Sequence, residues 1–152
     1  MRRGSFLFAV IALAAWGQGS AVLSIAPVQK VQAKRNDTVP VTIKAQLRDG
    51  FHVNSNKPND EYLIPIRLTW DAAPLQVEEV VYPKPDTVKS TFSEKPLSVY
   101  SGTFDLVSKL KVPANATAGP VLATGKLRYQ ACNDRMCLPP KTLEIPLTVY
   151  VQ

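Results

Sequence analysis

Apolar and polar residues alternate with a period of two along several segments of this chain, and no other feature restricts the fold as much. In segment 39–48, Val41 and Ile43 share one parity while Thr42 and Lys44 share the other. Because successive side chains of a β-strand point to opposite faces, the alternation predicts strands with one buried face. The pattern recurs in segments 64–70, 104–112, 121–131 and 143–151, and shorter strands are expected at 51–54 and 77–82.

Turn-forming residues separate these expected strands. The 13 prolines and 7 glycines fall mostly between the alternating segments, as at Asp49-Gly50. Pro65 lacks an N–H group, so the strand at 64–70 is expected at a sheet edge or at a bulge. We find no convincing long helix beyond the N-terminal apolar run. Short strands with regular turn spacing predict an all-β fold, namely an immunoglobulin-like antiparallel β-sandwich, with a β-barrel as the alternative.

The N-terminus is typical of a secretory signal peptide. Arg2 and Arg3 precede an apolar run at 6–16, and small residues follow up to Ala21. The run is shorter than the roughly 20 apolar residues that span a bilayer. We therefore expect cleavage after Ala21, with an uncleaved anchor as the alternative, and a single exported domain at 22–152. Its location would be periplasmic or extracellular, where disulfides persist.

Charge and composition argue against several classes of function. The formal net charge of +6 falls to +4 when Arg2 and Arg3 leave with the signal peptide, and the remaining basic residues are scattered. Nucleic-acid binding would require a basic stripe, so it is not expected. Two cysteines and the single His52 are too few to hold a structural metal ion. His52 itself is interpreted as an incidental polar residue of a strand. We expect a monomer without metal or cofactor.

The only two cysteines, Cys132 and Cys137, lie close together after segment 121–131 and before Pro139-Pro140. Strand parity places Cys132 on the solvent-facing side, and a hairpin-like turn would bring Cys137 opposite it. A disulfide closing this ring of about six residues is worth about 2.2 kcal/mol, against about 4.7 kcal/mol for a 100-residue loop. Such a bond is a poor staple but a workable redox switch. On these grounds alone a structural disulfide remains the favoured interpretation.

Two neighbouring features bear on that choice. Arg135 lies inside the ring and would favour a thiolate, whereas Asp134 would oppose it. The longest irregular segment, Pro83–Pro96, is polar and carries one aromatic residue, Phe92. Loops of this length are often functional, although Phe92 would also serve simply to plug the end of a sandwich.

Three segments together resemble a known family. They are Tyr129-Gln130-Ala131-Cys132 with Cys137-Leu138-Pro139-Pro140-Lys141-Thr142, then Asp49-Gly50-Phe51-His52-Val53, then Phe92-Ser93-Glu94-Lys95 with Val99-Tyr100. They are similar to segments of the N-terminal periplasmic domain of the thiol:disulfide interchange protein DsbD. The likeness covers most of residues 25–151, and the cysteine segment is its most specific part.

The resemblance implies an immunoglobulin-like sandwich whose cysteine pair shuttles between dithiol and disulfide. By position, Cys137 would form a mixed disulfide with a partner, Cys132 would resolve it, and Phe92 would cap the pair. Electrons would come from a thioredoxin-like donor and pass to oxidised periplasmic proteins. Longer family members continue into a membrane-spanning electron conduit, whereas this chain ends at Gln152. We therefore expect its electrons to come from a separate protein.

The function expected from residues and resemblance together is periplasmic thiol–disulfide exchange, as a component of protein-disulfide reduction. The alternative is a non-catalytic secreted immunoglobulin-like binding module, in which the disulfide only pins one hairpin. The reduction potential of the cysteine pair distinguishes the two.

Overall fold

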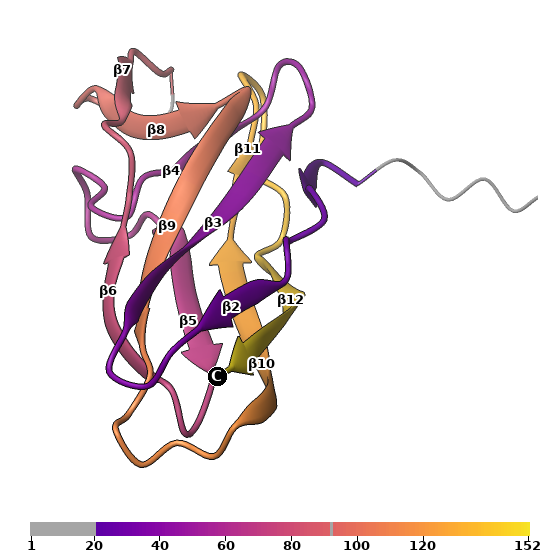
Figure 1. Ribbon diagram of the computed structural model, residues 1–152. Helices are drawn as coiled ribbons and strands as arrows, with labels where there is room; N and C mark the ends of the chain where they lie inside the picture. Colours follow the sequence, from indigo (N-terminus) through magenta and orange to yellow (C-terminus); the bar gives the residue numbers. More distant parts are fainter. Residues whose placement is uncertain (1–20, 92) are drawn as a thin grey trace, which may run out of the picture.

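The computed structural model describes residues 21–91 and 93–152 (Figure 1). Within these ranges the chain forms twelve strands and no helix. A helix long and apolar enough to cross a membrane is therefore absent from the described part of the chain. The signal peptide expected at 1–21 lies outside the described residues apart from Ala21, and the expected cap residue Phe92 lies outside them as well.

The strands form three sheets of four strands each. In spatial order, sheet A contains β1 (Leu23–Ile25), β3 (Thr38–Leu47), β9 (Thr103–Lys111) and β6 (Gln76–Val81). Sheet B contains β2 (Val31–Ala33), β12 (Lys141–Val151), β10 (Gly119–Tyr129) and β5 (Arg67–Asp71). Sheet C contains β11 (Ala131–Cys132), β4 (His52–Asn54), β8 (Leu97–Ser101) and β7 (Asp86–Val88). Neighbouring strands are antiparallel, except that β2 runs parallel to β12.

Sheets A and B pack against each other as an immunoglobulin-like sandwich, which confirms the predicted fold. In β3, Val41 and Ile43 are buried, whereas the polar residues that follow each of them, Thr42 and Lys44, are exposed, as the alternation predicts. Ile145, Leu147 and Val149 of β12 belong to the same core cluster. Burying each large aliphatic side chain stabilises the fold by about 1.5–3 kcal/mol, so these long strands supply most of the driving force.

A tryptophan accounts for two details of the sandwich. The Nε1 group of Trp70 in β5 donates a 2.8 Å hydrogen bond to Oγ of Ser108. Ser108 is the one polar residue on the buried face of β9, so this bond gives it a partner. Gly125 lies opposite Trp70, and a Cβ there would come within 3.1 Å of the indole ring. Strand β5 is at a sheet edge, as expected, although Pro65 precedes the strand instead of lying in it.

Sheet C lies at one end of the sandwich and consists of short extensions of its strands (Figure 1). Strand β3 leads into β4 through Gly50, whose φ is +81°, and β8 leads into β9 through Gly102, whose φ is +61°. A hydrogen bond of 2.8 Å from the Leu47 N–H to the Gly102 carbonyl joins these two turns. Strand β10 leads into β11 through Gln130. Glycine accommodates the positive φ angles without steric cost, so the chain turns between sheets A and C at both glycines.

The segment Pro83–Pro96 is less irregular than its composition predicts. Residues Asp86–Val88 form β7, which pairs with β8 at the edge of sheet C. Pairing with β8, the next strand along the chain, supplies hydrogen bonds that the local sequence pattern does not signal. Ser90 and Ser93 in the remaining part of the segment line a cavity that borders the cysteine pair.

Candidate functional site

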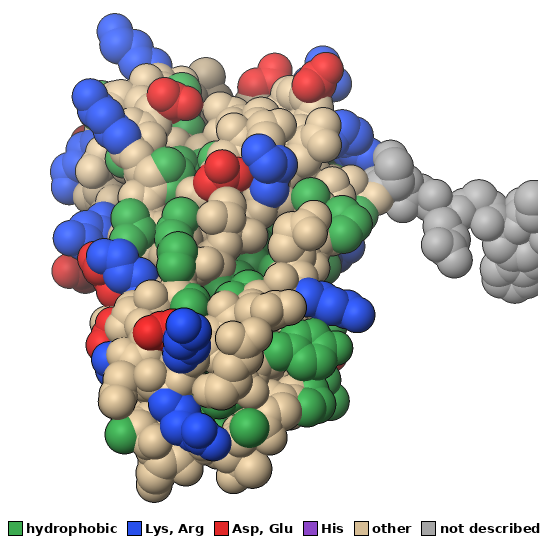
Figure 2. All heavy atoms as spheres, in the orientation of Figure 1, with side chains coloured by type: hydrophobic (Ala, Val, Ile, Leu, Met, Phe, Trp, Pro, Cys, Tyr) green, Lys and Arg blue, Asp and Glu red, His purple; other side chains and the backbone are tan. Residues whose placement is uncertain are grey.

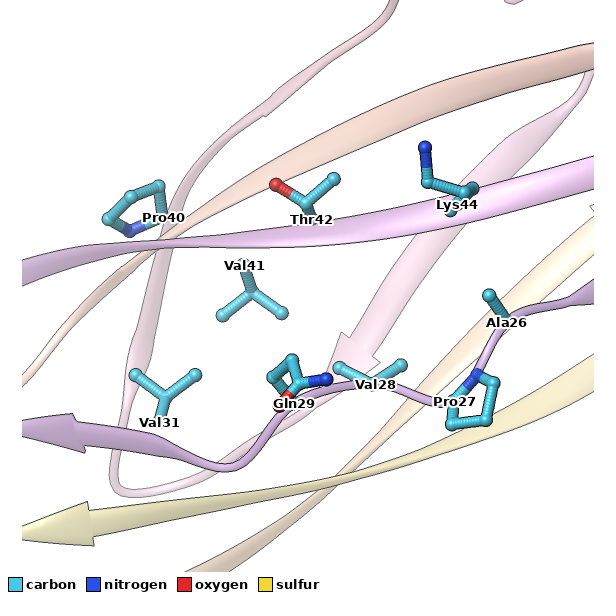
Figure 3. A pocket seen from close by; sticks show the side chains of 9 residues that line it. All are labelled: Ala26, Pro27, Val28, Gln29, Val31, Pro40, Val41, Thr42 and Lys44. Carbon is cyan, nitrogen blue, oxygen red and sulfur yellow. The ribbon is translucent and has the colours of Figure 1, made fainter.

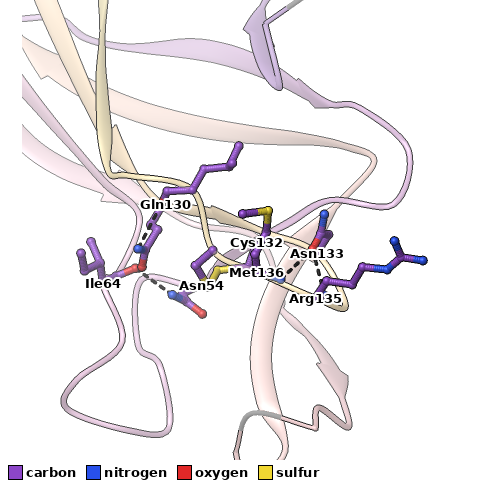
Figure 4. Close-up of a disulfide and its surroundings, with 9 residues drawn as sticks. Asn54, Ile64, Gln130, Cys132, Asn133, Arg135 and Met136 are labelled. Carbon is purple, nitrogen blue, oxygen red and sulfur yellow. Dashed lines mark hydrogen bonds between the residues drawn. A yellow bond between two sulfur atoms is a disulfide. The ribbon is translucent and has the colours of Figure 1, made fainter.

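A disulfide joins Cys132 and Cys137 across a tight hairpin at the edge of sheet C (Figure 4). The two residues form an isolated antiparallel bridge, and their Cα atoms lie 4.0 Å apart. The hairpin-like turn predicted from the sequence is therefore confirmed.

The hairpin is also held by hydrogen bonds that do not involve sulfur. The Leu138 N–H donates to the Ala131 carbonyl at 2.8 Å, and the Asn133 N–H donates to the Met136 carbonyl at 2.9 Å. The Asn133 side-chain oxygen accepts from the N–H groups of Arg135 and Met136, both at 2.9 Å (Figure 4). An Asn side chain that bonds its own loop in this way is a local turn former. These hydrogen bonds provide the hairpin with a scaffold that does not depend on the S–S bond.

Two amide side chains hold the hairpin and its neighbouring loop in place. The Gln130 Nε2 group donates to the Leu138 carbonyl at 3.1 Å, and the Asn54 Nδ2 group donates to the Ile64 carbonyl at 3.0 Å (Figure 4). Asn54 is 1% exposed, so its amide is a buried polar group with a partner. Satisfied buried hydrogen bonds of this kind favour one arrangement over its alternatives.

The two sulfur-bearing residues differ in exposure. Cys137 is exposed, whereas Cys132 is only 4% exposed. The prediction that Cys132 faces solvent is therefore wrong. It extended the parity of β10 to Cys132, but β10 ends at Tyr129, and Cys132 pairs with His52 of β4 in a different sheet. A visiting thiolate consequently meets Cys137 first.

A cavity of about 260 Å³ borders both cysteines. Side chains from three parts of the chain line it: His52 from sheet C, Tyr62 from the loop before β5, and Ser90 with Ser93 from the loop before β8. Tyr62 is 67% exposed. The cavity gives the disulfide an approach from solvent that is bounded by loops.

The loop before β8 is tied to the loop before β5 through Asp60. Ser93 Oγ donates to one Asp60 oxygen at 3.0 Å, and Lys95 Nζ lies 3.2 Å from the other. Asn59 adds a hydrogen bond from its side-chain amide to the Pro96 carbonyl at 2.6 Å. The Lys95 hydrogen bond is the largest influence that lowers the pKa of Asp60, and it outweighs the opposing effect of burial. The carboxylate is therefore charged, and it holds two loops together beside the cavity.

His52, which was interpreted from the sequence as an incidental polar residue, lines this site. It is the register partner of Cys132, and it lines the disulfide cavity. Its Nε2 atom is buried and has no hydrogen-bond partner among the described residues. Burial lowers the pKa of the imidazole. No local pattern could have signalled this position, because the β4–β11 pairing joins segments that are distant in the sequence.

Charged residues contribute little directly at the sulfurs. Arg135 is exposed and extends away from the disulfide (Figure 4), so water screens its expected effect on a thiolate. On the face shown in Figure 2, lysine and arginine side chains lie dispersed among acidic and apolar ones. In the part of the chain that the structure describes, no three His, Cys, Asp or Glu residues gather closely enough to hold a metal ion.

A larger groove of about 480 Å³ lies elsewhere, between β3 and the segment that leads into β2 (Figure 3). Val28, Val31 and Val41 face it, and Lys44 is the one charged residue in its lining. The lining contains no cysteine, histidine or carboxylate, so it offers no thiol chemistry and no acid–base pair of that kind.

Comparison with solved structures supports the same fold. The N-terminal domain of DsbD from Neisseria meningitidis in the reduced form matches with 22% identity and a TM-score of 0.50, over 84% of this chain and 90% of that one. The complex of the DsbD and PilB N-terminal domains from the same organism matches with 20% identity and a TM-score of 0.50, over 80% of each chain. The N-terminal periplasmic domain of ScsB from Proteus mirabilis matches with 14% identity and a TM-score of 0.52, over 81% of this chain and 44% of that one.

The family assignment rests on the sequence. A search of curated proteins gave no match. The family model described as thiol:disulfide interchange protein DsbD, N-terminal, matches residues 20–148, which is most of the chain. Together with the Cys132–Cys137 disulfide, this match supports a thiol–disulfide exchange module. The chain belongs to the family of DsbD N-terminal domains.

Proposed function

We propose that this protein is a periplasmic module that passes electrons from a thioredoxin-like donor to oxidised exported proteins through Cys132 and Cys137. One observation carries the proposal: an exposed sulfur-bearing residue is bonded to a buried one, beside a cavity, on a hairpin with its own hydrogen bonds. Such a pair opens and closes without unfolding the hairpin that presents it.

Reduction of the module proceeds by two displacements at sulfur. A donor thiolate attacks Cys137 Sγ, the Cys132–Cys137 bond breaks, and Cys132 leaves as a thiolate that takes up a proton. The second donor thiolate then attacks the donor sulfur of the mixed disulfide and releases Cys137. Two electrons and two protons have moved, and the donor is left as a disulfide.

Delivery to an acceptor reverses these roles. The Cys137 thiolate attacks an acceptor disulfide and forms a mixed disulfide, and one acceptor sulfur leaves. Cys132 then attacks Cys137 Sγ, which restores the intramolecular bond and releases the acceptor as a dithiol. The difference in exposure supports these separate roles, since Cys137 is exposed and Cys132 is buried.

The comparisons support the partner and the location. A similar domain is known in complex with the PilB N-terminal domain, and another is described as periplasmic. The signal peptide at residues 1–21 and the single domain at 22–152 stay predictions that agree with export. No cofactor is needed, because thiolate exchange requires only sulfur nucleophiles.

The decisive experiment is equilibration of the purified domain with thioredoxin or glutathione buffers of known potential. We expect a potential well above about −300 mV and full reduction by a thioredoxin-like donor. The variant Cys132→Ser should trap a mixed disulfide through Cys137. A wild-type pair that stays oxidised against the donor would contradict the proposal and favour a non-catalytic binding module with a structural disulfide.

Phe92 is proposed as a shield for the pair. The support is indirect: Ser90 and Ser93, on either side of it in the sequence, line the cavity that borders both cysteines. Replacement Phe92→Ala should speed alkylation of the reduced thiols by iodoacetamide. Tyr150→Ala is the control, because it removes an exposed aromatic residue of β12 that does not line this cavity, and it should leave the rate unchanged. An unchanged rate in Phe92→Ala would remove the shielding role.

A further inference from the structure

His52 and Cys132 lie directly opposite each other in the antiparallel pair of β4 and β11. Directly opposite residues of antiparallel strands place their side chains on the same face, with Cβ atoms about 4.5–5.5 Å apart. Both residues also line the cavity beside the disulfide. The imidazole and the buried sulfur therefore border the same small cavity.

In the neutral tautomer that carries its proton on Nδ1, the His52 Nε2 atom can accept a hydrogen bond. It is buried and without a partner among the described residues, in a molecule whose cysteines are oxidised. Unpaired buried polar atoms are rare in native proteins and are often tied to a redox or catalytic role. A disulfide sulfur carries no proton, whereas a thiol does. Opening the bond therefore creates at Cys132 the donor that Nε2 lacks.

The resolving step needs a proton acceptor at this position. A thiol attacks only as its thiolate, and a buried site disfavours a charged thiolate unless a base takes the proton. Burial lowers the pKa of His52, so its ring is neutral at neutral pH and keeps a free lone pair. No other residue in the lining of the cavity offers an imidazole or a carboxylate.

The surroundings of the imidazole are simple. Ser101 of β8 lies opposite it on the other side, and Tyr62 is the remaining titratable side chain of the cavity apart from the cysteines. Lys89 and Asp134, of opposite charge, line an adjacent cavity of about 280 Å³ that His52 also borders. The charged residues that line this adjacent cavity are thus one cation and one anion.

We propose that His52 Nε2 accepts the proton of Cys132 Sγ when Cys132 resolves the mixed disulfide at Cys137. The Cys132 electron pair forms the bond to Cys137 Sγ, and the bond between Cys137 and the partner sulfur breaks. The partner sulfur leaves with the electron pair and is protonated by the imidazolium or by water. This assignment rests on the proposed function, in which Cys137 carries the partner.

A chromogenic disulfide reports the reactions of Cys137 and Cys132 as two separate kinetic phases in one experiment. The reduced domain is mixed with dithiobis(nitrobenzoic acid) in less than stoichiometric amount. Attack by Cys137 releases the first thionitrobenzoate, and attack by Cys132 on the resulting mixed disulfide releases the second. Stopped-flow absorbance follows both phases across about pH 5–9, the range in which a histidine titrates.

The variant His52→Gln keeps a hydrogen-bonding side chain but cannot take up a proton. We expect it to slow the second phase by about 10- to 100-fold near neutral pH and to remove the histidine inflection from its pH profile. The first phase should be unchanged, which also shows that the variant is folded. Ser101→Ala, which alters the other neighbour of His52, should change neither phase. Equal slowing of both phases, or an unaffected second phase, would overturn the assignment.

A second measurement needs no substitution. The chain has 1 histidine, so in protein without a histidine tag its imidazole resonances need no assignment. The NMR titration of His52 should shift between the oxidised and reduced forms, and identical titrations would also overturn the assignment. A wild-type protein that releases only one thionitrobenzoate would contradict the exchange function itself. Two releases without any effect of His52→Gln would contradict only the role of His52.

Discussion

The sandwich of long strands and the end of the molecule with short strands differ in what they contribute to this protein. Strands β3, β10 and β12 have 10, 11 and 11 residues, whereas β4 and β11 have 3 and 2. The long strands bury aliphatic side chains between sheets A and B. The short strands carry the disulfide, His52 and a cavity. Stability is concentrated in the first region and chemistry in the second, because short strands leave backbone and side chains free to shape a site.

The end of the molecule that carries the disulfide has short strands, and specific polar contacts hold it together. The buried hydroxyls of Ser55 and Ser98 share a hydrogen bond of 2.8 Å. The Tyr100 hydroxyl lies 3.0 Å from both Asn56 Oδ1 and the Pro83 carbonyl, and burial raises its pKa. Buried polar groups with partners specify geometry more than they add net stability. The comparison therefore predicts that substitutions in the two regions have separable effects.

The largest expected effect is on exchange. Cys137→Ser should abolish electron transfer from a thioredoxin-like donor, because it removes the exposed sulfur that a partner attacks. Loss of this short ring should cost only about 2.2 kcal/mol of unfolding free energy. The measurements are donor oxidation and urea unfolding on the same protein. A large loss of folding together with residual electron transfer would show that the disulfide is structural and not the redox-active bond.

Leu127→Ala should show the opposite profile. Leu127 is 0% exposed in the sandwich core, so truncation should lower the unfolding free energy by about 2–5 kcal/mol. Because the cysteine hairpin has its own hydrogen bonds, the rate of disulfide reduction by a small phosphine should stay unchanged under folding conditions. A rate that rises in step with the loss of stability would show that the two regions open as one unit.

The smallest expected effect concerns the tie between the two loops beside the cavity. Asp60→Asn removes the partner of Lys95 and should speed phosphine reduction of the disulfide by about two- to fivefold. Asp105→Asn is the matched control, because it breaks an exposed ion pair with Lys44 of 3.5 Å in sheet A, away from the site.

Acidification should reproduce the Asp60 effect in the wild-type protein. The pKa of Asp60 is lowered below its ordinary value of 3.8, so the tie is fully present above that pH. It is lost as the pH falls through the depressed value in the folded protein. The reduction rate should therefore rise at strongly acidic pH in the wild type and not in Asp60→Asn. A rise of the same size in both proteins would assign the effect to another group.

Sequence reasoning succeeded where the information is local. The alternation of Val41 and Ile43 with polar neighbours predicted β3 and its buried face, and the close spacing of Cys132 and Cys137 predicted the hairpin. It failed at β7, and it failed on the exposure of Cys132. Both errors involve strands of two or three residues, which are too short to show a periodic signal; β7 pairs with the next strand along the chain, and β11 pairs with the distant β4.

The amino-acid sequence by itself determined the strands, the sandwich and the cysteine hairpin, because side-chain alternation and a short loop act over a few residues. Only the tertiary structure decided that Cys132 is buried, that Cys137 is exposed and that His52 lies opposite the buried sulfur. Those relations depend on the register between β4 and β11. That register is set by the turns that direct both strands away from the sandwich, and by the packing at its end.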